Sequence, residues 1–402
     1  MTWRWQPPVH SPVSLGSLLA GVGASTGFGH PRHDDVAATL RGLFGAQAVH
    51  LTDSGTSALI VAIRALVRPG GTIALPAYGC IDLSGAALFA GVRVRLYDLD
   101  PATLSPDLES LRRTVERGVD AIVVAHLYGY PADAAAVGAI AAEYGVPVID
   151  DAAQGAGSTL NGVRTGGLGD VGVLSFGRGK GTTGGSGGAA LVQNARLGSR
   201  VALAASLGAP PRGVGTLVPL AAQWMLARPT LYRMPASIPA LKLGEMVYHP
   251  AHEPRALSRA AAAVVHGALL RDPDEVHARR ERAEQLRVLA VEARRFRPVR
   301  SVSGGQPGYL RFAVLGVASD VEPAPHLGAL RGYPLTLDQH APLRDLLLPG
   351  ETAGAGARTL RDHLFTLPTH SHVTSRDLDR SGRWLGAQRR PHHATISASE
   401  IA

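Results

Sequence analysis

Residues 121–151 read AIVVAHLYGYPADAAAVGAIAAEYGVPVIDD, and this stretch indicates the fold class. It opens with a continuous apolar run, continues as an alanine-rich helical pattern that ends at a glycine, and closes with a second apolar run. Continuous apolar runs are typical of strands that are buried on both faces of a parallel sheet. The stretch therefore predicts a strand–helix–strand unit of the kind that builds parallel sheets.

The same alternation extends from about residue 35 to residue 200, which predicts an α/β fold with a mostly parallel central sheet and helices on both faces. After residue 255 the pattern changes to two long helical segments and isolated strands. We therefore expect a large α/β domain over residues 1–255, with an apolar insertion at about 205–250, and a small α+β domain over residues 256–402.

Composition narrows the functional classes. The chain has 40 basic and 32 acidic residues, and no dense basic run is interleaved with aromatic residues, so nucleic-acid binding is not supported. A diffuse positive charge also suits anionic small molecules. The single cysteine, Cys80, excludes an internal disulfide framework and fits a reducing cytoplasm, where we expect the protein to be located.

Two apolar segments raise the question of membrane contact. Residues 1–25 superficially resemble a signal peptide, but the apolar run is short and follows three prolines, so we do not expect one. Residues 217–243 form the most apolar long segment, and Arg228, Arg233 and several prolines interrupt it, which argues against a bilayer span. We favour a packed helical insertion, and contact with a membrane surface or a lipid-facing groove is the alternative.

Lysine is almost absent from this chain. Lys180 and Lys242 are the only two lysines among the 40 basic residues. Arginine cannot act as a primary amine, because its guanidinium stays protonated. Lys180 also lies inside a glycine-rich stretch, LSFGRGKGTTGGSGG (174–188), so it is a candidate nucleophile; a chance surface lysine is the alternative.

Four polar segments fall where predicted strands end or helices begin, which is where sites form in open α/β sheets. They are SGTSAL (54–59), HLYGYPAD (126–133), VIDDAAQ (148–154) and LSFGRGK (174–180). SGTSAL places hydroxyls beside the free N–H groups of a helix N-terminus, which makes an anion site, although a simple N-cap is the alternative. VIDDAAQ supplies two carboxylates, one of which is expected to point to the edge of the sheet.

An anion site, a carboxylate and a lysine on one rim are the groups that a pyridoxal phosphate enzyme requires. Lysine forms the Schiff base. A carboxylate pairs with the pyridinium nitrogen and keeps it protonated. Hydroxyl groups and the helix terminus hold the phosphate.

The order and spacing of these motifs resemble the DegT/DnrJ/EryC1/StrS family of pyridoxal-phosphate-dependent sugar aminotransferases. The resemblance is close over residues 35–195 and weaker in RALSRAAAAVV (255–265) and LFTLPTHSHVTSRDL (364–378). It implies a fold-type I homodimer with active sites near the subunit interface. It also implies transfer of an amino group from glutamate or glutamine to a keto sugar, most simply one linked to a nucleotide.

The resemblance assigns roles to individual residues. Lys180 is implied as the Schiff-base lysine and proton shuttle, Asp151 as the partner of the pyridine nitrogen, and Gln154 as a neighbour of the ring hydroxyl. The residues implied to hold the phosphate are Thr56, Ser57 and Ser175, with Gly55 allowing close approach.

Three features depart from the family pattern. The family stacks an aromatic side chain on the cofactor from the segment matching PAYGC (76–80), where this chain aligns Cys80, so either Cys80 or Tyr78 is expected to cover the ring. Many members have a histidine two residues after the DAAQ glutamine, where this chain has Ala156. The segment from about 205 to 250 is longer and more apolar than expected.

Alternative functions follow from these departures. A cyclitol or a lipid-linked ketone is an alternative acceptor, and a non-catalytic relative that binds the cofactor, or a plain phosphate-binding scaffold, is an alternative class. The presence of Lys180, Asp151 and Gln154 together favours the enzyme.

Other candidate residues carry weaker signals. His370 and His372 form an H-x-H pair without nearby cysteine or acidic partners, so we expect a loop and no metal. His126 either contacts substrate or is a hydrogen-bonded core histidine. The GTTGGSGG run lacks the ending of a Walker nucleotide loop. Asp53 and Arg178 are expected to serve local structure.

Overall fold

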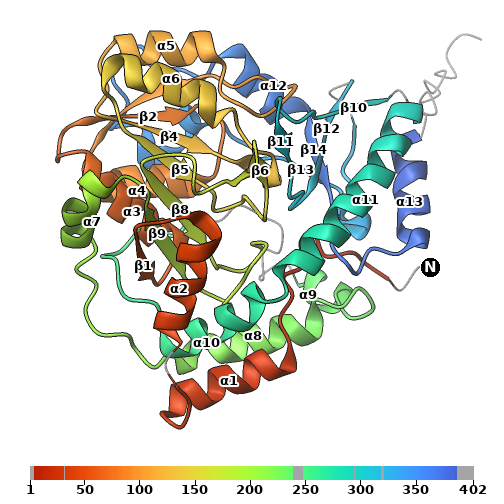
Figure 1. The fold of residues 1–402 in the computed structure, drawn as a ribbon. Coiled ribbons are helices and arrows are strands. Elements are labelled where there is room, and N and C mark those ends of the chain that lie inside the picture. Colours follow the sequence, from red (N-terminus) through yellow and green to blue (C-terminus); the bar gives the residue numbers. More distant parts are fainter. Residues whose placement is uncertain (1–3, 31, 239–247, 294, 318–320, 387–402) are drawn as a thin grey trace, which may run out of the picture.

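A seven-stranded sheet forms the centre of the molecule (Figure 1). The computed structural model describes residues 4–30, 32–238, 248–293, 295–317 and 321–386. The strand order is β1-β9-β8-β5-β4-β2-β3, and the run from β8 to β3 is parallel throughout. Only β9 runs antiparallel to its neighbours β8 and β1. The strands are β1 Ala48–Thr52, β2 Thr72–Pro76, β3 Arg93–Tyr97, β4 Ala121–Ala125, β5 Val148–Asp151, β8 Val171–Ser175 and β9 Gly188–Val192.

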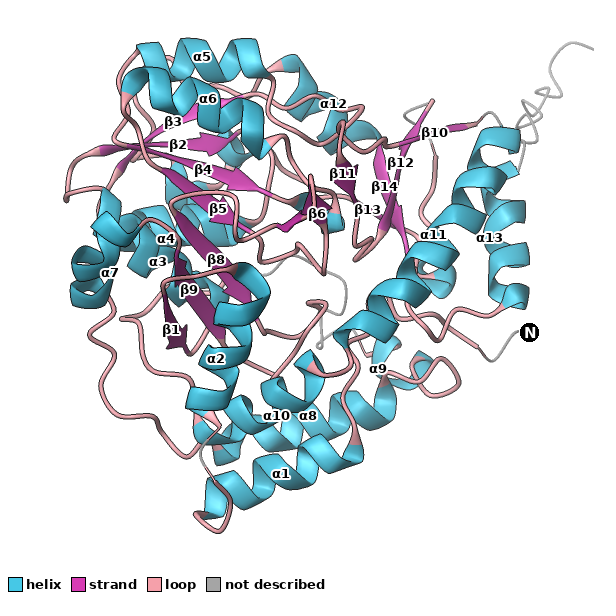
Figure 2. Ribbon diagram, viewed as in Figure 1, coloured by secondary structure: helices cyan, strands magenta, loops and turns pink. Residues whose placement is uncertain are grey.

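Helices cover both faces of this sheet, as Figure 2 shows. One face packs on α3 and α4 through the largest apolar core, which includes Ile60, Ile73, Val123 and Val173. The opposite face packs on α5 and α6 at one end and on α2 at the other. These helices are α2 His33–Phe44, α3 Gly55–Leu66, α4 Ile81–Ala90, α5 Leu108–Glu116, α6 Ala134–Tyr144 and α7 Gly198–Ala204.

Polar side chains fix where several of these helices begin. Asp107 accepts a hydrogen bond from the Ser110 N–H at the start of α5, and Asp133 accepts one from Ala136 at the start of α6. These caps satisfy N–H groups that the first turn of a helix leaves without partners. The strand–helix alternation predicted from the sequence is confirmed in this region.

A four-stranded antiparallel sheet forms a second layer toward the C-terminal end of the chain, with the order β10-β12-β14-β13. The helices α11 and α13 pack together against it. A small three-stranded sheet, β11-β6-β7, lies between the two larger ones. The remaining strands are β6 Thr159–Leu160, β7 Val163–Arg164, β10 Phe296–Pro298, β11 Gly305–Gln306, β12 Phe312–Gly316, β13 Leu330–Arg331 and β14 Leu364–Leu367.

The apolar insertion folds as helices on the outside of the molecule. Helix α8 (Val214–Leu226) runs beside α1 (Leu15–Thr26), and both pack on α10 (Arg259–Leu269), whereas α9 (Arg233–Ala236) is short. The helices α11 Asp272–Ala293, α12 Ala355–His363 and α13 Ser375–Gly386 complete the fold. The predicted helical insertion is therefore present up to residue 238, and residues 239–247 lie outside the described part. In the described ranges, every helix is too short or too polar to cross a bilayer.

The N-terminal segment contacts the C-terminal region of the chain. Arg4 forms an ion pair with Asp377 at 3.1 Å, and the Gln6 N–H donates to the His326 carbonyl at 3.2 Å. Helix α10 packs on α1 and α2 rather than on the four-stranded sheet. The domain boundary at residue 255 stays a prediction.

Candidate active site

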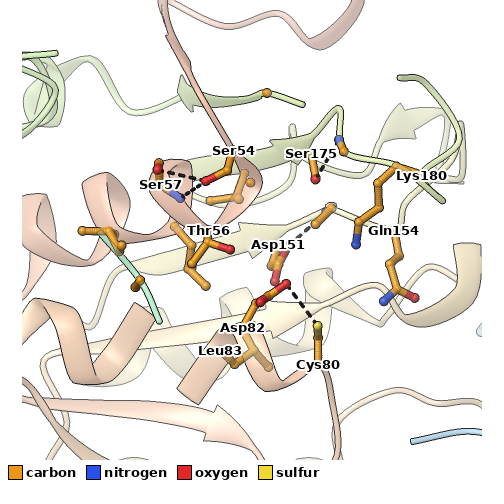
Figure 3. Close-up of a pocket in the computed structure, with 18 of the residues that line it drawn as sticks. Ser54, Thr56, Ser57, Cys80, Asp82, Leu83, Asp151, Gln154, Ser175 and Lys180 are labelled. Carbon is orange, nitrogen blue, oxygen red and sulfur yellow. Dashed lines mark hydrogen bonds between the residues drawn. The ribbon is translucent and has the colours of Figure 1, made fainter. Parts of the chain in front are cut away.

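A cavity of about 480 Å³ opens at the carboxyl ends of the parallel strands. It is lined by residues from β5, β8, the start of α3, the start of α4 and the loop after β8 (Figure 3). Eight of the predicted site residues line it: Gly55, Thr56, Ser57, Cys80, Asp151, Gln154, Ser175 and Lys180.

Lys180 lies on the loop that joins β8 to the antiparallel strand β9. Both ends of this loop are fixed, because Ser175 pairs with Gly188 and Gly177 forms a bridge with Gly185. The Lys180 side chain points into the cavity toward Asp151 and Gln154 (Figure 3). Within the described part of the chain, its Nζ atom has no hydrogen bond or ion pair, whereas its backbone carbonyl accepts a hydrogen bond from the Ser11 hydroxyl. The amine is therefore available to a bound group.

One glycine of the loop that carries Lys180, Gly187, occupies a position with no room for a side chain. Gly187 has φ 116°, a region that side-chain-bearing residues rarely adopt, and a Cβ there would come within 2.5 Å of Leu257 Cδ1. The absence of a side chain thus lets the loop close against Leu257, just before the start of α10.

Asp150 and Asp151 point in opposite directions, as alternation along a strand requires. The Asp150 carboxylate is buried and accepts hydrogen bonds from the N–H groups of Gly166 and Leu168, each at 2.7 Å. Asp151 faces the cavity and accepts one hydrogen bond, from the Ala153 N–H at 3.0 Å. Burial raises the pKa of Asp151, and the charge of Lys180 acts in the opposite direction. A cation bound next to Asp151 would therefore stabilise the charged form of its carboxylate.

His126 is a hydrogen-bonded core residue at the rim of the cavity. Its Nδ1 accepts from the Ala132 N–H at 2.9 Å, so its proton lies on Nε2, which donates to Asp150. Both ring nitrogens are therefore occupied, and the interpretation as a satisfied core histidine fits.

The start of α3 forms the polar end of the cavity. Ser54 is the N-cap and accepts from the Ser57 N–H at 3.0 Å, which also places the Ser57 hydroxyl 2.9 Å from that of Ser54. The Thr56 and Ser175 hydroxyls lie beside it (Figure 3). The N-cap and the anion site are thus compatible, because capping uses one N–H group and leaves the others of the first turn free.

Gly55 is required for a reason that the sequence did not indicate. A Cβ at this position would lie 2.6 Å from the Ser175 Cβ and 2.7 Å from its Oγ. The missing side chain therefore lets the end of β8 approach the start of α3 and brings Ser175 to the polar end of the cavity.

Gln154 is held by two tyrosines. Its Oε1 accepts from the Tyr128 N–H at 3.0 Å, and its Nε2 donates to the Tyr333 hydroxyl. Tyr128 has φ 55°, a strained value for a non-glycine residue. The side-chain amide therefore has a fixed orientation at the wall of the cavity.

Of the two candidates for covering the cofactor ring, Cys80 lines the cavity and Tyr78 does not. Tyr78 is fully buried, and its hydroxyl accepts from the Tyr333 N–H at 2.6 Å, so its ring belongs to the core beneath the site. The Cys80 thiol donates to Asp82 at 3.4 Å. Burial raises the pKa of Cys80 to about 12, so the thiol is protonated at neutral pH.

Further residues line the cavity that the sequence reasoning missed. Asp82 follows Cys80 by two positions, and the segment 249–252 arrives from the far end of the insertion. No spacing signal connects that segment with strand ends more than 70 positions away. Asp53 and Arg178, interpreted as local structure, also line the cavity, and Asp53 lies 3.6 Å from His252.

His370 and His372 lie elsewhere and pack with His10. The ring centroids of His10 and His372 are 4.0 Å apart, and His370 Nε2 donates to the Pro7 carbonyl at 2.9 Å. In the described ranges, no group of three or more His, Cys, Asp or Glu side chains has the geometry to hold a metal ion.

Comparison with known proteins shows what the chain resembles. Residues 25–219 match the model of the DegT/DnrJ/EryC1/StrS aminotransferase family. A 124-residue segment is 36% identical to a UDP-N-acetyl-3-dehydro-alpha-D-glucosamine 3-aminotransferase of Acidithiobacillus ferrooxidans, covering 31% of this chain and 34% of that protein. A 151-residue segment is 36% identical to an L-glutamine:2-deoxy-scyllo-inosose aminotransferase of Streptoalloteichus tenebrarius, covering 37% of this chain and 35% of that protein. The matches thus span about a third of the length of these relatives.

The fold extends well beyond those segments. The crystal structure of the sugar aminotransferase CalS13 from Micromonospora echinospora superposes with a TM-score of 0.75 and 21% identity, over 95% of this chain and all of that one. The predicted fold-type I architecture, with a mostly parallel central sheet and helices on both faces, is confirmed.

Proposed function

We propose that this protein is a pyridoxal-phosphate-dependent aminotransferase that transfers an amino group from glutamate or glutamine to a keto sugar linked to a nucleotide. One observation carries the proposal: the amine of Lys180, which has no partner among the described residues, and the partly buried carboxylate of Asp151 line the same cavity as the hydroxyl-bearing start of α3. The names of the relatives, one acting on a nucleotide sugar and one on a cyclitol, support a keto-sugar or related acceptor.

The residues present fit the cofactor. Asp151 lacks the cation that would offset its burial, and a protonated ring nitrogen is such a cation. The Thr56, Ser57 and Ser175 hydroxyls and the free N–H groups of the first turn of α3 suit a phosphate. Among the described residues that line the cavity, Lys180 is the only lysine. The chemistry of the donor set thus matches an aldehyde, a basic ring nitrogen and a phosphate on one small molecule.

Each of these side chains has a distinct task in amino transfer. When bound, the cofactor supplies an electron-accepting ring that stabilises negative charge on the carbon beside the transferred nitrogen. Lys180 would hold the cofactor through Nζ and, once its amine is free, would carry the proton between the substrate carbon that bears the transferred nitrogen and the cofactor carbon bonded to that nitrogen. Asp151 would keep the ring nitrogen protonated. Gln154, held by Tyr128 and Tyr333, would orient the ring from one edge.

The acceptor lies above the ring in this proposal, where Cys80 offers a smaller side chain than an aromatic residue. Asp82 lies beside Cys80 at the same wall. A carboxylate at this wall suits hydroxyl groups, which can donate hydrogen bonds to it. A cyclitol ketone such as 2-deoxy-scyllo-inosose is therefore the second candidate acceptor. A homodimer in the cytoplasm is part of the proposal by family resemblance.

The chain offers a clean test, because it has only two lysines. The protein incubated with pyridoxal phosphate and reduced with borohydride is expected to carry one covalent label on the peptide containing Lys180, read by mass spectrometry. The Lys180→Ala variant is expected to carry none, and the matched Lys242→Ala variant is expected to keep it. Absence of label on Lys180 in a folded protein that binds the cofactor would contradict the proposal.

A second assay identifies the substrates. The visible absorption of the loaded protein is expected to fade with glutamate or glutamine and to return with an acceptor ketone. A panel that compares keto sugars linked to UDP or dTDP with cyclitol ketones assigns the acceptor class. Loss of colour with a donor and no recovery with any ketone in the panel would argue against both acceptors.

A further inference from the structure

The loop that carries Lys180 has little conformational constraint of its own. Six of the twelve residues from 176 to 187 are glycine, and glycine leaves the backbone more freedom than any other residue. Gly179 and Gly181 flank the lysine, so neither of its neighbours has a side chain that could hold it. The direction in which Lys180 points is therefore fixed by contacts from outside the loop.

Hydrogen bonds from two distant segments hold the loop on either side of Gly181. The Ser11 hydroxyl donates to the backbone carbonyl of Lys180. The Thr182 hydroxyl donates to the Asp272 carboxylate at 3.3 Å. Ser11 and Asp272 are both buried, and hydrogen bonds in a buried setting are stronger than those exposed to water. We call these two hydrogen bonds the lysine clamp.

Gly181 lies between the two bonds and packs on Ala156. A Cβ on Gly181 would lie 3.0 Å from the Ala156 Cβ, which is tighter than an ordinary van der Waals contact. Ala156 has φ 51°, an uncommon value for a residue with a side chain. Its carbonyl accepts a hydrogen bond from Nη2 of Arg279, a buried residue of α11, at 3.0 Å. Helix α11 therefore supports the loop at Gly181 as well as at Thr182.

The two anchors of the clamp are themselves held in place. Ser11 belongs to the N-terminal segment that contacts the C-terminal region of the chain. Asp272 is the first residue of α11 and forms ion pairs with Arg164 at 3.4 Å and with Arg279 at 3.8 Å. Both anchors lie outside residues 25–219, so the family match assigns no role to either of them.

We propose that Ser11, Thr182 and Asp272 are positioning residues that aim the Lys180 amine, an inference that rests on the proposed function. The described lining of the cavity includes none of the three, so they act through the backbone of residues 180–182. A reacting group has to be held within about 0.5 Å of its productive geometry, and a misplacement of about 1 Å can lower the rate about 100-fold. In a glycine-rich loop, the clamp supplies this precision.

Hydrogen exchange of the protein without cofactor tests the clamp itself. Ser11→Ala removes one bond, and Thr182→Val removes the other while it conserves the shape of the side chain. Each variant is expected to speed amide exchange in the peptide 176–187 about fivefold, the effect of losing one hydrogen bond of ordinary net strength. The matched control is Ser14→Ala. Ser14 lies in the same segment but caps α1 through the Ser17 N–H, so its loss is expected to leave exchange of the loop unchanged.

Kinetics of the loaded protein separate positioning from a purely structural role. Ser11→Ala and Thr182→Val are expected to lower kcat about 10- to 100-fold and to leave the KM for the amino donor within about twofold, because the clamp acts on the proton-carrying amine and not on donor binding. Thr182→Ser keeps the hydroxyl and is expected to restore most of the rate. Ser14→Ala is expected to lower the melting temperature through loss of a cap and to leave kcat unchanged.

Two results would overturn the proposal. One is that Ser11→Ala and Thr182→Val exchange and turn over like the wild type. The other is that Ser14→Ala lowers kcat as much as Ser11→Ala, because the loss would then reflect general destabilisation of the N-terminal segment. A wild-type protein in which borohydride fixes no cofactor on Lys180 would instead contradict the proposed function, and exchange of the loop would still decide whether the clamp holds it.

Discussion

Asp151 shows how one side chain can cost stability and still be retained. Its neighbour Asp150 is surrounded by N–H donors, whereas Asp151 has one such donor and faces the cavity. Because burial raises the pKa of Asp151, the folded protein binds its proton more tightly than the unfolded chain does. The unfolding free energy therefore falls as pH rises above the unfolded value of about 3.9.

Asp151→Asn is expected to have opposite effects on the empty and the loaded protein. Without cofactor, the variant should melt at the same or a higher temperature than the wild type at pH 7, because no buried charge is left. Its pyridoxal phosphate affinity should fall roughly 10- to 100-fold, the equivalent of a charge-assisted hydrogen bond of about 1.5–3 kcal/mol. Thermal denaturation and absorbance titration measure the two effects, with Asp151→Glu as the charge-conserving control. Unchanged affinity would show that Asp151 does not meet the ring nitrogen.

Strand β8 and helix α3 approach each other closely at Gly55. Gly55→Ala is expected to force the two elements apart, because the added Cβ would lie 2.6 Å from the Ser175 side chain. The expected cost is about 1–3 kcal/mol of unfolding free energy, as for other overpacked positions. Urea denaturation measures it.

Two companion variants make this measurement specific. Gly42→Ala on α2 has no atom within 4 Å of the added carbon and is expected to be neutral or slightly stabilising, because alanine favours a helix. Ser175→Gly in the Gly55→Ala background removes most of the clash and is expected to restore part of the loss. Equal stability of Gly55→Ala and the wild type would contradict the close approach.

The sequence predicted those elements whose patterns are local. Buried parallel strands such as β4 and capped helices such as α5 and α6 carry their own signals, and so do the polar residues that follow each strand. Strand β9 was not predicted, because its first residue continues a glycine run that is typical of a loop, and its antiparallel pairing with β8 is a tertiary effect. Strand β1 pairs only with β9 and was missed with it. The choice between Tyr78 and Cys80 also needed the structure, since both positions follow the same strand.

At the scale of the whole molecule, the N-terminal segment and the C-terminal region meet at a cluster of histidines. Burial, with smaller contributions from His372, His370 and Arg279, lowers the pKa of His10 to about 2. Burial also lowers the pKa of His370 to about 3. The folded protein therefore keeps these two imidazoles neutral, whereas the unfolded chain protonates them near pH 6.5.

Because of this cluster, we expect the free energy of unfolding to decrease as the pH falls. A histidine with a depressed folded pKa contributes stability that is complete above the unfolded pKa and is lost as pH falls toward the folded one. Between pH 6.5 and 5, each of the two imidazoles is expected to cost roughly 2 kcal/mol of unfolding free energy. Urea midpoints at pH 7, 6 and 5 measure the decline, which His370→Asn should make shallower, whereas the exposed His30→Asn should not. An identical slope in His370→Asn would assign the acid sensitivity to other groups.

The path of residues 4–13 has a mechanical consequence. This segment is attached to the C-terminal region through Arg4–Asp377 and His370–Pro7, and a few residues later the Ser11 hydroxyl holds the backbone carbonyl of Lys180. A movement of the C-terminal region would therefore be transmitted through residues 4–11 to the backbone of Lys180, the residue that carries the reactive amine.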